Sequence, residues 1–170
     1  MTTSTCEAVR DQTSTVELRP LQRGDRSTVL EVFEGLGPRS RELRFLTAKP
    51  RLTEGELRRL TEVDDHDHVA IVAHEPGSGR PIGIGRFVRL PGDPESADVA
   101  MAVVDAWQGR GVGTLLAEAL RLCAETVGVR RFTALTQEDN RPVFRLLQRG
   151  DAVDVLAHDY DSVELAVTWD

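Results

Sequence analysis

Three glycines stand where a strand-like segment gives way to a helical one. The stretch WQGRGVGTLL occupies residues 107–116, and Gly109, Gly111 and Gly113 alternate in it with other residues. The backbone N–H groups at the start of a helix carry partial positive charge and have no acceptor within the helix. Glycine places no side chain between these groups and an anion. The run therefore predicts a site for a phosphate or a pyrophosphate.

The spacing of the glycines excludes two common phosphate motifs. A Walker loop ends in Gly-Lys-Ser/Thr, and the run holds no lysine. The dinucleotide fingerprint reads G-x-G-x-x-G, whereas the spacing here is G-x-G-x-G, and no early parallel βαβ unit surrounds it. A glycine-rich turn without a ligand is the alternative, because short motifs also match by chance.

Hydrophobic patterns place the glycine run between a strand and a helix. Residues 97–105 (ADVAMAVVD) read as a strand, and residues 112–127 carry apolar side chains at steps of three and four. Upstream, a short strand is expected at residues 16–21, and Thr53 and Glu56 form a capping-box pattern at the start of a helix. The amides of the helix at 112–127 would then face the end of the strand before it.

The remaining segments predict mostly antiparallel strands. Strands are expected at residues 68–75, 80–90, 130–136, 152–158 and 163–169, with a helical segment at 23–36 and a short helix at 139–149. The order is strand, two or three helices, three strands, helix, strand, helix and two strands. This order is typical of a mixed α+β domain and not of a doubly wound sheet.

Length and composition fit one globular domain. The chain has 170 residues, of which 40% are hydrophobic, and roughly two-thirds of the unfolded surface should be buried at this length. Residues 1–15 are rich in serine and threonine and are expected to form a flexible tail before a domain at 16–170. No segment approaches the roughly 20 apolar residues of a membrane span. The N-terminus also lacks the apolar core of a secretory signal.

Charge and cysteine content limit the partners and the compartment. The net charge of -7 argues against a nucleic-acid partner, because phosphate binding needs basic residues. Only Cys6 and Cys123 are present, so no framework of disulfides is expected and a reducing, cytoplasmic location is favoured.

Two charged clusters invite a functional interpretation. The segment DDHDH, residues 64–68, looks like a metal site, but no distant Cys/His set completes it, and a solvated acidic turn is favoured. Together with Glu62, its carboxylates would attract a cationic substrate. Arg39, Arg41 and Arg44 form a basic cluster that is expected at the solvated surface, with binding to an acidic face of a protein substrate or hydrogen bonds within the fold as the alternatives.

The run VVDAWQGRGVGTLL, residues 103–116, resembles motif A of the GNAT superfamily of N-acetyltransferases. The signature of that motif is Q/R-x-x-G-x-G/A, and Gln108, Gly111 and Gly113 match it position by position. The order of predicted elements agrees, and the resemblance extends from Val16 to the C-terminus. It implies an α+β fold with a mixed, mostly antiparallel central sheet of six to seven strands, flanked by about four helices.

The resemblance also implies a cofactor and the residues that bind it. In that family the loop of motif A holds the pyrophosphate of acetyl-CoA, and the strand before it offers backbone groups to the pantetheine arm. Acetyl-CoA is therefore expected as the acyl donor, and no metal is expected. The residues so implied are Met101, Val103, Val104, Gln108, Gly109, Arg110, Gly111, Val112, Gly113 and Thr114.

A second stretch, SRELRFLTAKPRLTEGELRRLTEVDDHDHVAIVA at residues 40–73, is similar to the N-terminal half of bacterial protein-lysine acetyltransferases of the Pat type. This similarity implies a protein lysine as acceptor. A lysine ammonium must lose its proton before it attacks a thioester, which costs about 4.6 kcal/mol at pH 7. A general base is therefore expected in the pocket.

In Pat-type relatives the base is a glutamate in a pattern like A-E-[VF]-A. Here the pattern reads ADVA, and Asp98 lies ten residues before Gln108, as the matching glutamate would. Its side chain is shorter by one methylene, about 1.5 Å, so an ordered water would bridge the gap or the substrate would sit deeper. The alternative is a solvent-facing aspartate at the start of a strand.

Many GNAT enzymes use a tyrosine as general acid, seven residues after an asparagine of the following motif. The matching asparagine is Asn140, and the position seven residues later is Leu147, so no tyrosine acid is expected. Asn140 is expected to hydrogen-bond the cofactor, with a plain helix N-cap as the alternative.

Two other functions stay open at this point. The acceptor could be a small amine such as a polyamine, an amino acid, an antibiotic or a toxin, because an acidic chain suits any cationic acceptor. The domain could instead bind acyl-CoA as a sensor without turnover, which the short Asp98 and the missing tyrosine keep in view. No membrane partner is expected, and a homodimer is left open.

Overall fold

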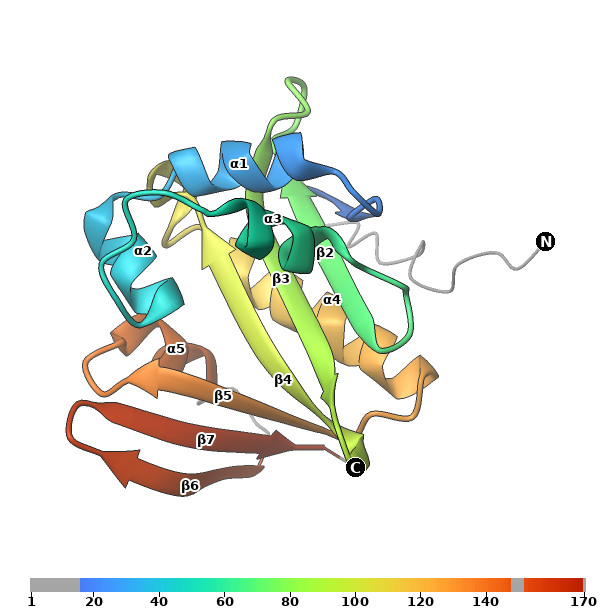
Figure 1. Cartoon of the computed structure of the whole chain (residues 1–170), viewed down its shortest axis with the longest axis vertical. Coiled ribbons are helices and arrows are strands. Elements are labelled where there is room, and N and C mark those ends of the chain that lie inside the picture. The colour runs from blue at the N-terminus through green and yellow to red at the C-terminus, as the bar shows by residue number, and fades with distance from the viewer. Residues whose placement is uncertain (1–15, 148–151, 170) are drawn as a thin grey trace.

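Seven strands form one sheet, and in the described residues five α-helices lie on its two faces (Figure 1). The computed structural model describes residues 16–147 and 152–169. The strands, in the order β1-β2-β3-β4-β5-β7-β6 across the sheet, are β1 Glu17–Pro20, β2 His68–His74, β3 Pro81–Leu90, β4 Asp93–Val103, β5 Arg131–Gln137, β7 Ser162–Thr168 and β6 Ala152–Asp159. The helices are α1 Arg26–Glu34, α2 Pro38–Phe45, α3 Glu54–Thr61, α4 Val112–Thr126 and α5 Arg141–Leu147, with a 3-10 turn at Asp105–Trp107.

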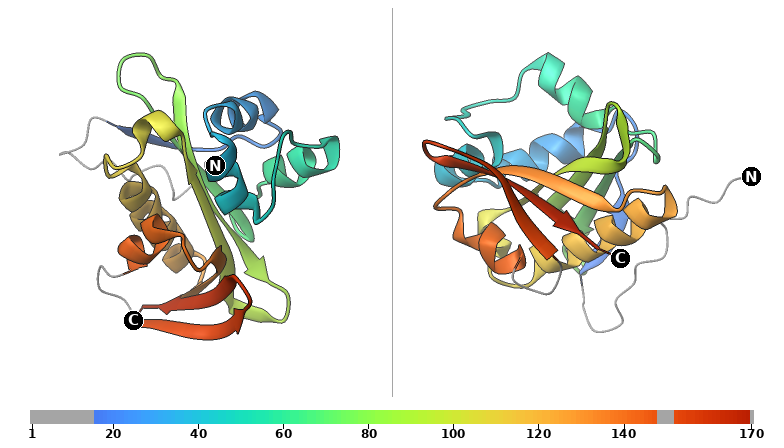
Figure 2. Two further views of the ribbon diagram at one scale, coloured as in Figure 1. Left: turned by 90° about the vertical axis from the view of Figure 1, so that its left-hand side faces the viewer. Right: turned by 90° about the horizontal axis from the view of Figure 1, so that it is seen from below.

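The helices divide between the two faces of the sheet. α1, α2 and α3 lie over one face, and α4 and α5 lie over the other (Figures 1 and 2). α4 packs its apolar stripe on β2 and β3, where two glycines allow a close approach. A Cβ on Gly85 would stand 2.7 Å from Leu120 Cδ1, and one on Gly83 would stand 3.2 Å from Leu116 Cδ1. A side chain at either position would require the facing leucine of α4 to shift.

β4 and β5 form the one parallel pair among the described strands, and they separate after three residues. The paired positions are Ser96 with Arg131, Ala97 with Phe132 and Asp98 with Thr133. Beyond them β4 stays with β3 and β5 stays with β7, each in antiparallel register. The two strands therefore open into a V, which is visible in Figure 1 between the yellow-green and orange arrows.

The predicted element order and the mixed, mostly antiparallel sheet are confirmed. The first helix begins at Arg26 and not at residue 23, because the Asp25 carboxylate accepts the Thr28 amide at 3.1 Å and caps the helix there. β4 begins at Asp93 and not at residue 97, because a tight turn after Leu90 returns the chain directly into pairing. The predicted capping box at residues 53–56 is present.

Some predictions fall outside the described residues. They concern the expected tail at residues 1–15, which includes Cys6, and the end of the last helix at Gly150. Of the helices that the structure describes, none combines the length and the apolar character needed to cross a membrane.

Candidate active site

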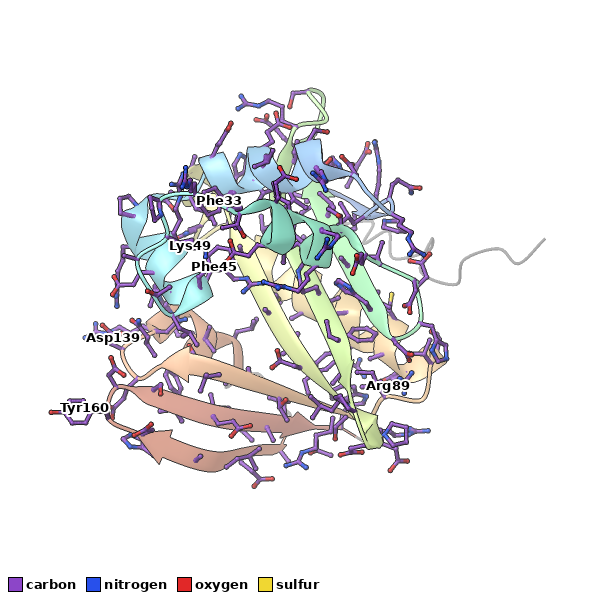
Figure 3. All side chains as sticks on the ribbon, in the orientation of Figure 1. Phe33, Phe45, Lys49, Arg89, Asp139 and Tyr160 are labelled. Carbon is purple, nitrogen blue, oxygen red and sulfur yellow. The ribbon has the colours of Figure 1, made fainter. Side chains whose placement is uncertain are left out.

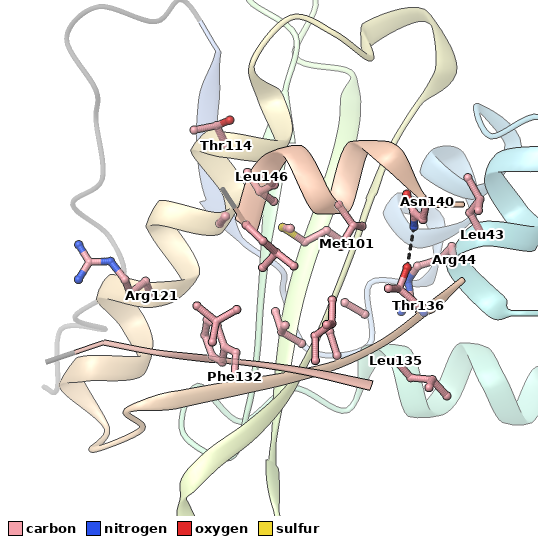
Figure 4. Close-up of a pocket in the computed structure, with 18 of the residues that line it drawn as sticks. Leu43, Arg44, Met101, Thr114, Arg121, Phe132, Leu135, Thr136, Asn140 and Leu146 are labelled. Carbon is pink, nitrogen blue, oxygen red and sulfur yellow. Dashed lines mark hydrogen bonds between the residues drawn. The ribbon is translucent and has the colours of Figure 1, made fainter. Parts of the chain in front are cut away.

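The V between β4 and β5 opens into a cavity of about 500 Å³. β4, β5, α4 and α5 supply most of its walls, and α2 closes one side. Figure 4 draws Met101 of β4, Phe132 of β5 and Leu146 of α5 around this space. The volume is in the range of small-molecule and cofactor sites. The cavity therefore passes through the sheet, from the side of α4 and α5 to the side of α2.

The free edge of β4 faces this cavity with its backbone. The Val104 amide donates to Ile82 O at 2.9 Å, toward β3. Alternate residues of a strand direct their N–H and C=O groups to opposite neighbours, so those of Val99, Met101 and Val103 point to the side on which β5 has moved away. The structure thus favours Met101 and Val103 as backbone contacts for an extended ligand, whereas the Val104 amide already serves the sheet.

The glycine run forms a bare loop at the start of α4. Gly109 and Gly111 adopt positive φ angles of 73° and 84°, which glycine adopts without strain. A Cβ on Gly109, Gly111 or Gly113 would meet nothing within 4 Å. The first helical amide with a backbone acceptor is that of Leu115, which donates to Gly111 O at 3.1 Å.

The amides of Val112, Gly113 and Thr114 therefore stand at the unpaired start of the helix. Thr114 also lines the cavity, so the loop and the V share one opening. This is the arrangement that an anion attached to an extended arm would need.

Two side chains of the loop have contacts within the protein. Gln108 Nε2 donates to Val103 O at 3.0 Å and to Ser40 Oγ at 3.1 Å, and so ties the loop to β4 and α2. Arg110 lies over the ring of Trp107, with its guanidinium carbon 4.7 Å from the ring centroid. Direct contact of either side chain with the cofactor stays a prediction, and the structure gives Gln108 a positioning role.

The far wall of the cavity includes two buried residues with polar side chains. Asn140 is 7% exposed, lines the cavity and donates from Nδ2 to Thr136 Oγ1 at 2.9 Å (Figure 4). Trp169 is 6% exposed and also lines the cavity, and within the described residues its Nε1 has no acceptor. Trp169 was not predicted as a site residue, because a tryptophan at the end of a predicted strand usually indicates only core packing.

Asp98 lies at the closed end of the V, at the last paired position of β4 and β5. Val99 and Ala100, which follow it, line the cavity, but Asp98 itself does not. Asp98 is exposed to solvent on one side. The protein that surrounds the rest of its carboxyl partly desolvates it, and this desolvation raises the pKa of the carboxyl. The guanidinium of Arg44 opposes this rise, and the carboxylate of Glu164 adds to it.

The three arginines of α2 do not share one solvated surface: Arg39 is exposed, as the sequence predicted, whereas Arg41 and Arg44 are partly buried. Arg39 donates to Asp139 Oδ2 at 2.6 Å and to Gln137 Oε1 at 3.1 Å, and so joins α2 to the segment after β5. Arg41 lies 4.0 Å above the ring of Phe33. Arg44 lines the cavity.

The acidic turn before β2 uses its carboxylates in its own structure. Asp64 Oδ1 accepts the amides of His66, Asp67 and His68 at 2.8–3.0 Å. Asp67 Oδ1 accepts from Arg89 Nε at 2.7 Å. Across the described ranges, no group of three His, Cys, Asp or Glu side chains is arranged to hold a metal ion.

Comparison with known proteins gives the same family by sequence. The profile described as "Acetyltransferase (GNAT) domain" matches residues 15–153. Acetyltransferase Pat of Mycolicibacterium smegmatis is 36% identical over 136 residues, which cover 80% of this chain and 40% of that protein. Acetyltransferase PA5475 of Pseudomonas aeruginosa is 29% identical over 128 residues, which cover 74% of this chain and 68% of that protein.

Solved structures agree with the sequence matches. The GNAT domain of S. lividans PAT matches with a TM-score of 0.82 at 28% identity, over 91% of this chain and 90% of that one. The cAMP-binding acyltransferase from Mycobacterium smegmatis matches with a TM-score of 0.61 at 31% identity, over 90% of this chain and 43% of the other. The chain thus spans less than half of the mycobacterial proteins that it matches. With its V-shaped opening in the sheet and its bare glycine loop, the chain belongs to the GNAT family of acetyltransferases.

Proposed function

We propose that this acetyltransferase moves an acetyl group from acetyl-CoA to the side-chain amine of a protein lysine, with Asp98 as the general base. The observation that carries the proposal is the position of the cavity. It runs through the V from the start of α4, with its bare amides, to residues 99–101 of β4, which directly follow Asp98. Donor and acceptor can then approach from opposite faces of the sheet.

The residues present fit acetyl-CoA. The amides of residues 111–114 suit the diphosphate, and the outward backbone groups of Met101 and Val103 suit the amides of the pantetheine arm. When bound, acetyl-CoA supplies the activated thioester. Asn140 Nδ2 donates one hydrogen to Thr136, so we expect its second N–H or its side-chain oxygen to bind the cofactor.

Asp98 would take a proton from the incoming ammonium, directly or through one water. The pKa of its carboxyl is raised by burial, which brings a carboxylate closer to the range where a base works near neutral pH. No tyrosine stands ready as general acid among the described residues: Tyr160 is 99% exposed at the tip of the β6–β7 hairpin and points away from the sheet (Figure 3). We therefore expect the leaving sulfur to take its proton from water.

Turnover of a lysine peptide tests the proposal. The wild type should acetylate the peptide, and Asp98→Ala should bind acetyl-CoA with unchanged affinity while losing most of the turnover. Heat of binding measures the first property, and mass spectrometry of the peptide measures the second. Acetyl-CoA binding without turnover of any amine would favour a sensor, and acetylation of small amines alone would contradict the lysine acceptor.

A further inference from the structure

Two arginines from different elements meet in a small pocket beside the main cavity. Arg44 of α2 and Arg86 of β3 both line this second pocket, which has a volume of about 30 Å³. Arg44 also lines the main cavity, so it forms the boundary between the two spaces. The other walls are mostly apolar. They include Phe33 of α1, Phe45 of α2, Leu52 of the segment between α2 and α3, and Ile84 of β3.

Arg86 is fixed in place by neutral partners. It is 7% exposed, and its Nη1 donates to Leu60 O at 2.7 Å and to His68 Nε2 at 3.2 Å. His68 can accept there because its Nδ1 donates to Glu62 O at 3.0 Å, which leaves Nε2 with a lone pair. Burial, with a further contribution from the charge of Arg44, lowers the pKa of Arg86 to about 9. The guanidinium of Arg86 is thus fixed by hydrogen bonds to neutral groups, and these bonds do not compensate its positive charge.

Arg44 is similarly short of negative charge. Its guanidinium carbon lies 4.9 Å from the ring centroid of Phe45, and among the carboxylates of the described residues it is the charge of Asp98 that raises its pKa. Within residues 16–147 and 152–169, no carboxylate stands within ion-pair distance of Arg44 or Arg86. Two like charges in a partly dry site are costly unless an anion compensates them.

We propose that Arg44 and Arg86 bind a carboxylate carried by the acceptor, close to the amine that is acetylated. The guanidinium matches a carboxylate with paired hydrogen bonds, and the volume of the pocket suits a group of that size. Arg44 lines the cavity and its charge acts on Asp98, so the carboxylate and the amine of one acceptor would be bound together. This inference rests on the proposed amine acetylation and narrows its substrate class.

Such a carboxylate has two sources. One is an acidic side chain near the acceptor lysine of a protein. In an extended peptide, residues two positions apart share a face, so glutamate at position −2 or +2 is the placement that we expect to be selected. The other source is the carboxylate of a free amino acid whose own amine is acetylated.

The test compares paired substrates and paired variants. One nine-residue peptide carries a single lysine with glutamate at −2 and +2, and its match carries glutamine there; free lysine and free glutamate serve as the small substrates. The variants are Arg44→Gln and, as a charge control, Arg59→Gln on the exposed side of α3. The wild type should prefer the acidic peptide in kcat/KM by about tenfold or more. Arg44→Gln should remove that preference, and Arg59→Gln should keep it.

Outcomes separate this inference from the proposed function. Equal kcat/KM for the two peptides in the wild type, with no acetylation of free amino acids, would overturn the carboxylate site and leave lysine acetylation standing. Acetylation of a free amino acid alone, sensitive to Arg44→Gln, would support the site and overturn the protein acceptor.

A measurement without turnover covers the case in which neither substrate is used. Glutarate at millimolar concentration should raise the Tm of the wild type above that in sodium chloride of equal ionic strength, and it should not do so for Arg44→Gln. The same Tm shift in both proteins would contradict the site. Arg44→Gln is preferred to a change at Arg86, because the buried Arg86 also supports Leu60 and His68.

Discussion

The two ends of the cavity are built in different ways. At the donor end, the loop of residues 109–114 offers backbone amides, and its glycines place no side chain over them. At the acceptor end, Arg44 lines the cavity, Arg86 lines the small pocket beside it, and Asp98 lies just outside on β4. These three residues come from separate elements and depend on their side chains. A site made of backbone is set by local geometry, whereas a site made of charged side chains is set by the packing that brings distant segments together.

The largest expected effect separates chemistry from binding at the acceptor end. Asp98→Asn keeps the shape of the side chain and removes the base, so kcat should fall by about 10²–10⁴-fold. The Kd for acetyl-CoA should stay within a factor of two of the wild type, because the cofactor loop is untouched. Initial rates with a lysine peptide and calorimetry with acetyl-CoA measure these two quantities. Asp98→Glu, which restores the longer carboxylate, should retain activity, and full activity in Asp98→Asn would rule out the base role.

The next effect breaks the donor end without harming the fold. Gly113→Asp places a carboxylate in open space at the first turn of α4, where the helix dipole favours negative charge. The Tm should therefore hold or rise, while repulsion of the diphosphate should weaken acetyl-CoA binding by about tenfold or more. Gly113→Ala is the matched control and should bind normally. If Gly113→Asp bound acetyl-CoA as tightly as the wild type, the diphosphate would have to lie elsewhere.

A smaller effect tests whether the charges at the acceptor end act on one another. Burial raises the pKa of Asp98, and the positive charge of the Arg44 guanidinium partly offsets that rise. Since the base must be deprotonated, the rate falls as the pH drops below this pKa. In Arg44→Gln the acid limb of the profile of log kcat/KM should therefore move to higher pH. The profiles are measured with the glutamine peptide, so that a loss of carboxylate binding does not affect them. An acid limb that did not move would contradict an electrostatic interaction between Arg44 and Asp98.

The smallest effect concerns the free energy of unfolding and the contribution that His68 makes to it as a hydrogen-bond partner of Arg86. Burial lowers the pKa of His68 from its usual 6.5, and the positive charge of Arg86 lowers it further. As the pH falls, His68 therefore takes up a proton in the unfolded chain at a higher pH than in the folded chain. The contribution of neutral His68 to the free energy of unfolding is complete above about pH 6.5 and is lost as the pH falls toward the pKa of the folded state. Urea unfolding at pH 7.5 and 5.5 should show a smaller loss in His68→Gln than in the wild type. An equal loss in both proteins would show that His68 does not contribute.

Local features were readable from the sequence because their causes are local. The capping box of Thr53 and Glu56, the glycine loop and the order of the elements follow from short spacings, and each is present. The separation of β4 from β5 was not readable, because it depends on β5 remaining paired with β7 some 30 residues later.

The charged residues at the acceptor end could not be predicted from the sequence, because their arrangement also depends on contacts between distant segments. Arg44 stands next to Arg39 and Arg41 in the sequence, and nothing in that pattern distinguishes the arginine that turns toward the cavity. Arg86 follows an apolar run in β3, and an arginine in the middle of that strand is the signal that could have been noticed. The partial burial of Asp98 required the positions of α2 and β7.

A crystal structure of the complex with acetyl-CoA tests the central claim most directly. We expect diphosphate oxygens within about 3 Å of the amides of residues 111–114, the pantetheine arm along Met101 and Val103, and the thioester in the V beside Val99. A diphosphate bound away from this loop, or an arm that does not enter between β4 and β5, would contradict the account.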